Sequence, residues 1–231
     1  MQNLFSASIA LLDVDAVVFD MDGLLLDTEV LARRALRLAG EELGIDIPET
    51  LSQSMIGVPL DGCRLLLVEH HGDSVPADRL FAASARHLLA QVEAGELRIK
   101  PGVTEVLDRV RELGLPLAVA TSSARQKAHD HLRATGLDER FDAIVTRDDV
   151  RRGKPSPDLY LHAAKAVRVA PQRCLALEDS YNGVRAAHAA GMTVVMVPDL
   201  LPPTAEMREL CHAIARDLHV VALALGTRRA P

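Results

Sequence analysis

The chain contains few aromatic residues and no tryptophan: Phe, Trp and Tyr together make up 3% of its 231 residues. Stacking on nucleic-acid bases would therefore have few partners, because such binding relies on aromatic faces. Positive charge is outweighed by negative charge and forms no long basic block. The formal net charge is -6, and the basic pairs Arg33-Arg34 and Arg151-Arg152 are too short to form an extended basic surface. We expect no nucleic-acid partner.

Cysteine is rare, and the N-terminal segment lacks the features of a targeting sequence. Cys63, Cys174 and Cys211 are widely spaced and form neither a disulfide framework nor a zinc-binding pattern. The apolar stretch within residues 1–12 has no basic region before it and stops at Asp13. This pattern argues against a secretory signal or a membrane span, so we predict a cytoplasmic protein with no membrane partner.

Several common catalytic motifs are missing. The sequence contains no Gly-x-Ser-x-Gly elbow, no Gly-x-Gly-x-x-Gly fingerprint and no His-Glu-x-x-His pair. Lys154 follows Gly153, but Asp148 occupies the position where a phosphate-binding Walker loop has its first glycine. These absences leave serine hydrolases, dinucleotide-binding enzymes, zinc proteases and P-loop proteins without motif support.

The composition is that of a folded globular protein, with 48% hydrophobic and 25% charged residues. Strand-like runs alternate with helical periodicity from about residue 98 onward, which predicts βαβ units and a mainly parallel sheet. The predicted strands are 16–19, 115–120, 143–145, 174–177 and 193–197, and the predicted helices are 103–113, 124–134, 158–167 and 184–190. Residues 28–97 show helical spacing only, so a helical block interrupts an α/β domain.

Two carboxylates follow the first predicted strand. Asp20 and Asp22 come directly after the apolar run 16–19, and Gly23 follows them. Side chains at positions i and i+2 of an extended segment point to the same face, and unpaired carboxylates are costly away from water. A hard divalent cation such as Mg²⁺ is the simplest compensation, although a solvated Asp-Gly turn would have the same sequence.

Three further polar clusters follow predicted strands. They are Thr121-Ser122-Ser123, Lys154 within Gly153-Lys154-Pro155, and Glu178-Asp179-Ser180. Because ligands bind outside the carboxyl ends of strands in open α/β sheets, we expect these clusters to converge with Asp20 and Asp22. Taken singly, each has a simpler interpretation: the hydroxyls and the acids could cap helices, and the lysine could lie on the surface.

Together these groups suit phosphoryl transfer. One aspartate can attack phosphorus in line, while a second acid protonates the leaving alkoxide and later deprotonates a water molecule. A metal ion and a lysine neutralise the charge of the phosphate, and hydroxyl and N–H groups hold its oxygens.

The order of these motifs resembles the haloacid dehalogenase-like hydrolase superfamily, in the branch with a helical cap inserted after the first strand. The matching motifs are Asp20-Met21-Asp22-Gly23, Thr121, Gly153-Lys154-Pro155 and Glu178-Asp179-Ser180. The resemblance implies an α/β fold with a modified Rossmann core, a mainly parallel sheet and an inserted all-α helical cap domain. The discontinuous catalytic core would comprise residues 1–27 and 98–231, and the mobile cap residues 28–97.

The resemblance also implies a Mg²⁺ cofactor and its ligands. Asp20 would be both the nucleophile and a metal ligand. Asp22 would be the general acid and base, with its backbone carbonyl also contacting the metal. Asp179 would ligate Mg²⁺, and Glu178 would do so directly or through water.

The remaining implied roles concern the substrate, a small phosphorylated metabolite. Thr121, the backbone of Ser122, and Lys154 would bind the phosphoryl group. Sugar phosphates, phosphoglycolate and nucleotide or cofactor monophosphates are all candidates. The scarcity of aromatic residues and the leucine-rich cap favour small sugar or polyol phosphates. The sequence specifies neither the physiological substrate nor the oligomeric state.

Other members of the superfamily offer alternatives to a phosphatase. Sugar phosphomutases similar to β-phosphoglucomutase carry a cap-hinge histidine where this chain has Ala32, and a phosphate-gripping arginine where it has Leu60. Both departures favour a phosphatase. A dehalogenase needs no acid at Asp22. A non-catalytic interaction protein would be expected to have lost Asp20 or Asp22, and this chain keeps both.

Overall fold

The computed structural model describes residues 14–58 and 60–225, which form two compact units. Among these residues, one unit comprises 14–26 and 99–225, and the other comprises 27–98. We call the first the α/β unit and the second the helical unit. Each is described by itself.

The described residues do not cover the whole N-terminal segment. The prediction that there is no targeting sequence in residues 1–12 lies outside them. In the part of the chain that is described, no helix combines the length and the apolar character needed to cross a membrane.

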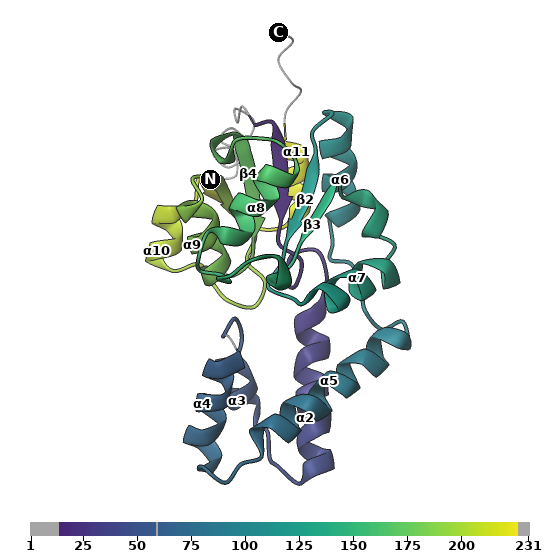
Figure 1. Ribbon diagram of the computed structural model, residues 1–231, viewed down its shortest axis with the longest axis vertical. Helices are drawn as coiled ribbons and strands as arrows, with labels where there is room; N and C mark the ends of the chain where they lie inside the picture. The colour runs from purple at the N-terminus through teal and green to yellow at the C-terminus, as the bar shows by residue number, and fades with distance from the viewer. Residues whose placement is uncertain (1–13, 59, 226–231) are drawn as a thin grey trace. The chain divides into compact units, whose positions relative to one another are not determined.

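The α/β unit contains a six-stranded parallel sheet (Figure 1). Its strands are β1 (Ala16–Phe19), β2 (Leu117–Ala120), β3 (Ala143–Val145), β4 (Cys174–Glu178), β5 (Thr193–Met196) and β6 (Ala213–Ile214). They follow the order β3-β2-β1-β4-β5-β6, and every neighbouring pair is parallel. All residues of β1, β2 and β4 are buried, which explains their continuous apolar sequences. The predicted α/β class with a mainly parallel sheet is confirmed.

Helices pack on both faces of this sheet. They are α6 (Val103–Glu112), α7 (Arg125–Ala134), α8 (Asp158–Ala166), α9 (Tyr181–Ala189), α10 (Ala205–Leu210) and α11 (Leu218–Ala224), with 3₁₀ turns η1 (Asp138–Arg140), η2 (Arg147–Asp149) and η3 (Pro171–Arg173). On one face, α8, α9 and α10 share a core with alternate strand residues such as Ala16 and Val18. Helix α6 contacts β2 and also packs against α11, as Figure 1 shows.

Several elements differ from the predicted ones. Strand β2 begins two residues late because the N–H of Leu115 still donates to Val110 O, at the end of α6 (3.2 Å). Helix α9 begins at Tyr181 rather than at Val184 because Ser180 caps it, accepting a hydrogen bond from Gly183 N (3.1 Å). The sequence pattern did not predict α3, α10, α11 or β6 as separate elements. The three helices have six or seven residues each, and β6 has only two.

The helical unit has its own core. Its helices are α2 (Thr28–Leu43), α3 (Glu49–Ser54), α4 (Leu60–His71) and α5 (Ala77–Glu93). Buried Leu31, Ala35 and Ala39 recur every four residues along α2, and α2 packs along α5. Leu67 of α4 and Leu80 of α5 are fully buried in the same unit. Its bounds differ by one residue at each end from those of the predicted cap.

The order of the strands creates a switch point beside β1. From β1 the chain proceeds to β2 and β3 on one side, and then returns to β4 on the other side of β1. Loops that follow β1 and β4 therefore leave the sheet in different directions, and ligands of open α/β sheets bind in the crevice between such loops. The residues directly after β1 and β4 are Asp20 and Asp179.

Substituting two leucines tests whether β4 lies in the core of the α/β unit. Leu175 of β4 is fully buried, whereas Leu223 of α11 is 84% exposed. We expect Leu175→Ala to lower the free energy of unfolding by about 2–5 kcal/mol, through lost transfer energy and a cavity. The matched Leu223→Ala change should stay within about 0.5 kcal/mol of wild type. Urea denaturation measures both, and equal losses would contradict the assignment.

Candidate active site

The loop after β1 brings two carboxylates to the switch point. Asp20 N–H donates to Leu177 O (3.0 Å), which ties the end of β1 to the end of β4. The Asp20 side chain is only 8% exposed. Gly23 adopts a positive φ of 88°, and a Cβ atom there would lie 2.3 Å from Asp179 Oδ2. A glycine is thus required both for the turn and for the close approach of Asp179.

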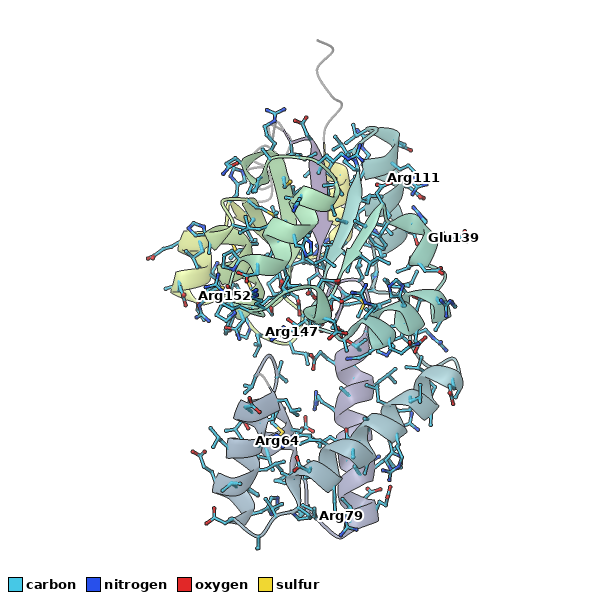
Figure 2. The ribbon with its side chains drawn as sticks, viewed as in Figure 1. Arg64, Arg79, Arg111, Glu139, Arg147 and Arg152 are labelled. Carbon is cyan, nitrogen blue, oxygen red and sulfur yellow. The ribbon has the colours of Figure 1, made fainter. Side chains whose placement is uncertain are left out.

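Lys154 is the buried cation of the site. Its side chain is 5% exposed and forms ion pairs with Asp20 and with Glu178 Oε1, the latter at 2.5 Å. Other basic residues nearby in the sequence are used differently: Arg147 and Arg152 lie on the connection between β3 and α8 (Figure 2). The Arg152 side chain is 73% exposed and pairs with Asp158 (2.9 Å). Lys154 is therefore buried, whereas most lysines lie on the surface of a protein.

Glu178 is fully buried, and both of its oxygens accept hydrogen bonds. Oε1 accepts from Lys154 and from the hydroxyl of Tyr160 (2.6 Å). Oε2 accepts from the N–H groups of Asp179 and Ser180 (both 3.1 Å) and from Ser180 Oγ (3.0 Å). These bonds anchor Glu178 at the end of β4, because a buried carboxylate is tolerated only when its acceptor sites are satisfied.

Asp22 contacts the hydroxyl cluster that follows β2. Ser123 Oγ donates to Asp22 Oδ2 (2.7 Å), and Thr121 Oγ1 lies 3.4 Å from the same oxygen. Lys127 Nζ, from the first turn of α7, lies 3.6 Å from Asp22 Oδ1. Ser122 is exposed between its two buried neighbours. The structure thus brings together the predicted clusters after β1 and β2.

Three carboxylates meet around the buried ammonium of Lys154. Oxygens of Asp20, Glu178 and Asp179 all lie within 4.8 Å of one another. Burial raises the pKa of Asp20 to about 8, and the negative charge of Glu178 adds to this against the opposing effect of Lys154. Burial followed by the charges of Asp20 and Glu178 also raises the pKa of Asp179 well above its usual range.

The pKa of Lys154 shows the same excess of negative charge. Burial alone would lower this pKa, but the charges of Asp20 and Glu178 outweigh burial and raise it. Among the described residues, no hydrogen-bond donor reaches the buried Oδ1 of Asp179. A set of hard carboxylate oxygens with surplus negative charge fits a divalent cation of the Mg²⁺ type.

Some residues of this region were not assigned a role from the sequence. Tyr160 lies on the buried face of α8, and its hydroxyl donates to Glu178. The signal for it in the sequence was a polar hydroxyl on an otherwise apolar helix face. Lys127 had no distinguishing feature. Asp199 follows the carboxyl end of β5 and ion-pairs with Lys100, so its position resembles that of the clusters that were recognised. Ser123 was recognised only as part of its cluster.

A Rossmann-like core with carboxylates, hydroxyls and a lysine at its switch point is typical of enzymes that act on phosphate esters. A family model described as haloacid dehalogenase-like hydrolase matches residues 14–191, and the chain belongs to that family. The family places the chain among hydrolases, in agreement with the site, and relatives of the chain are named as phosphatases.

Relatives and solved structures agree with this assignment. The chain is 36% identical over 181 residues to a phosphorylated carbohydrates phosphatase of Thermotoga maritima, with 78% of this chain and 82% of the relative covered. It is similar to the crystal structure of CbbY from Rhodobacter sphaeroides in complex with phosphate, with 29% identity, 89% and 95% coverage and a TM-score of 0.75. A β-phosphoglucomutase from Clostridium difficile, with 23% identity, 89% and 92% coverage and a TM-score of 0.73, shares the fold.

Gly183 allows a test of how Glu178 is held. A Cβ atom at this position in α9 would lie 1.7 Å from Glu178 Oε1, so Gly183→Ala must displace the carboxylate. We expect a loss of about 1–3 kcal/mol in the free energy of unfolding, and a large loss of phosphatase activity.

The matched control is Gly136→Ala, where a Cβ atom would meet nothing within 4 Å although φ is positive. That variant should lose about 1 kcal/mol through backbone strain and keep its activity. Urea denaturation and steady-state kinetics separate the two effects. Full activity of Gly183→Ala would show that the position of Glu178 does not matter.

Proposed function

We propose that this protein is a Mg²⁺-dependent phosphatase that hydrolyses a small phosphate monoester, most favourably a sugar phosphate, through an aspartyl-phosphate on Asp20. The observation that carries the proposal is the grouping of Asp20, Glu178 and Asp179 around Lys154, beside Asp22 with its own hydroxyl partners. The name of the Thermotoga maritima relative supports the class of substrate. The cytoplasm stays the predicted compartment.

Asp20, Asp179 and the backbone carbonyl of Asp22 would hold the cation, whose charge lowers the cost of approach for the phosphate dianion. The oxygens of Glu178 already accept bonds from Lys154, Tyr160 and the following turn. This saturation supports a contribution of Glu178 through water rather than by direct ligation.

In the first step, a carboxylate oxygen of Asp20 attacks phosphorus, and the bond from phosphorus to the ester oxygen breaks. Asp22 in its protonated form gives its proton to that leaving oxygen, so an alcohol departs. Lys154, the hydroxyl of Thr121 and the backbone of Ser122 would hold the other phosphoryl oxygens. Lys154 is suited to this because it is buried and already oriented toward Asp20.

In the second step, Asp22 takes a proton from a water molecule, which attacks the phosphorus of the aspartyl-phosphate. The bond between phosphorus and Asp20 breaks, and inorganic phosphate leaves while both aspartates return to their starting states. The bonds to Asp22 from Ser123 and Thr121 orient its carboxyl group for both proton transfers.

Replacing Asp20 tests this proposal directly. Asp20→Asn preserves the size of the side chain but removes the attacking carboxylate, so we expect phosphatase activity to fall by about 10⁴-fold or more. The control is Asp61→Asn, the same change at a fully exposed site in the helical unit, which should leave the activity unchanged.

Phosphate release from p-nitrophenyl phosphate with added Mg²⁺ measures both variants, and excess chelator should abolish wild-type activity. If the folded Asp20→Asn protein stayed within about tenfold of wild type, Asp20 would not be the nucleophile.

A second assay separates phosphatase from phosphomutase. Ala32, half-buried in α2, has no proton to donate, and Leu60, 52% exposed at the start of α4, offers no charge to a second phosphate. Without those groups the phosphoenzyme should transfer its phosphoryl group to water. We therefore expect net phosphate release from β-glucose 1-phosphate or similar esters, with little positional isomerisation.

Phosphorus NMR of reactions with and without glucose 1,6-bisphosphate follows both products. Rapid formation of glucose 6-phosphate with little free phosphate would instead identify a mutase.

A further inference from the structure

An ion pair outside the predicted motifs lies next to the acidic cluster. Val197 N–H donates to Glu178 O (2.7 Å), so the chain continues alongside β4 beyond the end of β5. Asp199 lies two residues further on, and its side chain is 13% exposed. Its Oδ1 pairs with the ammonium of Lys100, itself 22% exposed. In the described part of the chain, no donor reaches the buried Oδ2 of Asp199.

Lys100 is held from the side of the loop after β1. Its N–H donates to Leu25 O (2.9 Å), and the preceding residue, Ile99, forms an antiparallel bridge with Leu26. The segment 24–26 follows Asp22 and Gly23 directly in the chain. The ion pair of Lys100 and Asp199 thus connects the loop after β5 to the loop that carries the attacking carboxylate.

The loops that carry Asp179 and Asp199 leave neighbouring strands at the same edge of the sheet, because Glu178 of β4 and Met196 of β5 are paired in register. Asp179 and Asp199 each have one buried oxygen that no described donor satisfies. Two such carboxylates repel each other in a partly desolvated region unless positive charge lies close to both.

We propose that Asp199, held in place by Lys100, is a positioning residue for the divalent cation and sets how tightly the cation binds. The inference rests on the proposed function, because it assumes that Asp20 and Asp179 are the ligands. Asp199 adds negative charge beside Asp179, and the ammonium of Lys100 cancels part of it. Removing a group from the outer shell of a metal site typically changes metal affinity by 10–100-fold.

A purely structural role for the pair makes a different prediction. If Lys100 and Asp199 only tie two loops together, removing either partner breaks the same contact and affects cation binding in the same direction. If the pair sets the local charge, the two changes have opposite effects: loss of Asp199 weakens binding, and loss of Lys100 strengthens it. The sign of the effect therefore distinguishes the two roles.

The experiment measures binding of Mn²⁺ to chelator-treated, full-length protein from the EPR signal of the free ion, with Mg²⁺ as competitor. We expect Asp199→Asn to raise the dissociation constant about tenfold or more, and Lys100→Met to lower it about threefold or more. Matched controls are Glu206→Gln and Arg185→Met, which change the same charges in the ion pair of α9 and α10 (2.5 Å). Both controls should bind Mn²⁺ like wild type.

The possible outcomes distinguish a failure of this inference from a failure of the proposed function. Absence of Mn²⁺ and Mg²⁺ binding to wild type would contradict the proposed function itself. Tight binding to wild type with an unchanged constant for Asp199→Asn, or weakening by Lys100→Met, would contradict only the inference. Urea denaturation checks that each variant folds. Should Asp199→Asn not fold, Lys100→Met alone decides, since tighter binding supports the proposal and equal or weaker binding overturns it.

Discussion

The site depends on the burial of one ammonium among carboxylates. Lys154 is nearly inaccessible to solvent and pairs with both Asp20 and Glu178, while Asp179 lies in the same cluster. One positive charge cannot neutralise three negative ones, and burial prevents water from screening the remainder. Burial first, and then the negative charges of the neighbouring carboxylates, raises the pKa values of Asp20 and Asp179. Under the proposed function, the carboxylate of Asp20 must be ionised to attack phosphorus. It would therefore require further positive charge, which a metal ion bound at this cluster would supply.

Two glycines allow the carboxylates of this cluster to lie close to the backbone. Gly23 makes room for Asp179, and Gly183 makes room for Glu178. Glu178 is then held by donors from the turn after β4, from α8 and from the loop that carries Lys154. Its position is set by contacts from several elements, so it provides a fixed support against which Lys154 is oriented. Rigid placement of this kind is what catalysis by electrostatic preorganisation needs.

The sequence predicted the order of elements and the grouping of motifs better than it predicted the edges of the fold. Strands β1, β2 and β4 are fully buried, and β3 and β5 are partly buried. Each of these five parallel strands is mainly apolar, so the hydrophobic pattern alone located them. The two residues of β6 and the six of α10 are too short to establish any period. Tyr160 and Asp199 were missed as site neighbours because their local signals, a polar residue on an apolar helix face and an acid after a strand, become informative only once the neighbouring strands are known.

The choice between water and a sugar hydroxyl as phosphoryl acceptor does not depend on the groups that attack phosphorus. Asp20, Asp22 and Lys154 would serve a phosphatase and a phosphomutase equally, since both form and discharge the same phosphoenzyme. Only interactions that differ between the two acceptors can favour one of them. In the proposed reaction, Ala32 and Leu60 stand where a mutase would carry such groups, and their side chains neither donate a proton nor carry charge. A phosphoenzyme that meets no such group at these two positions would not favour a sugar over the acceptor present at the highest concentration, which is water.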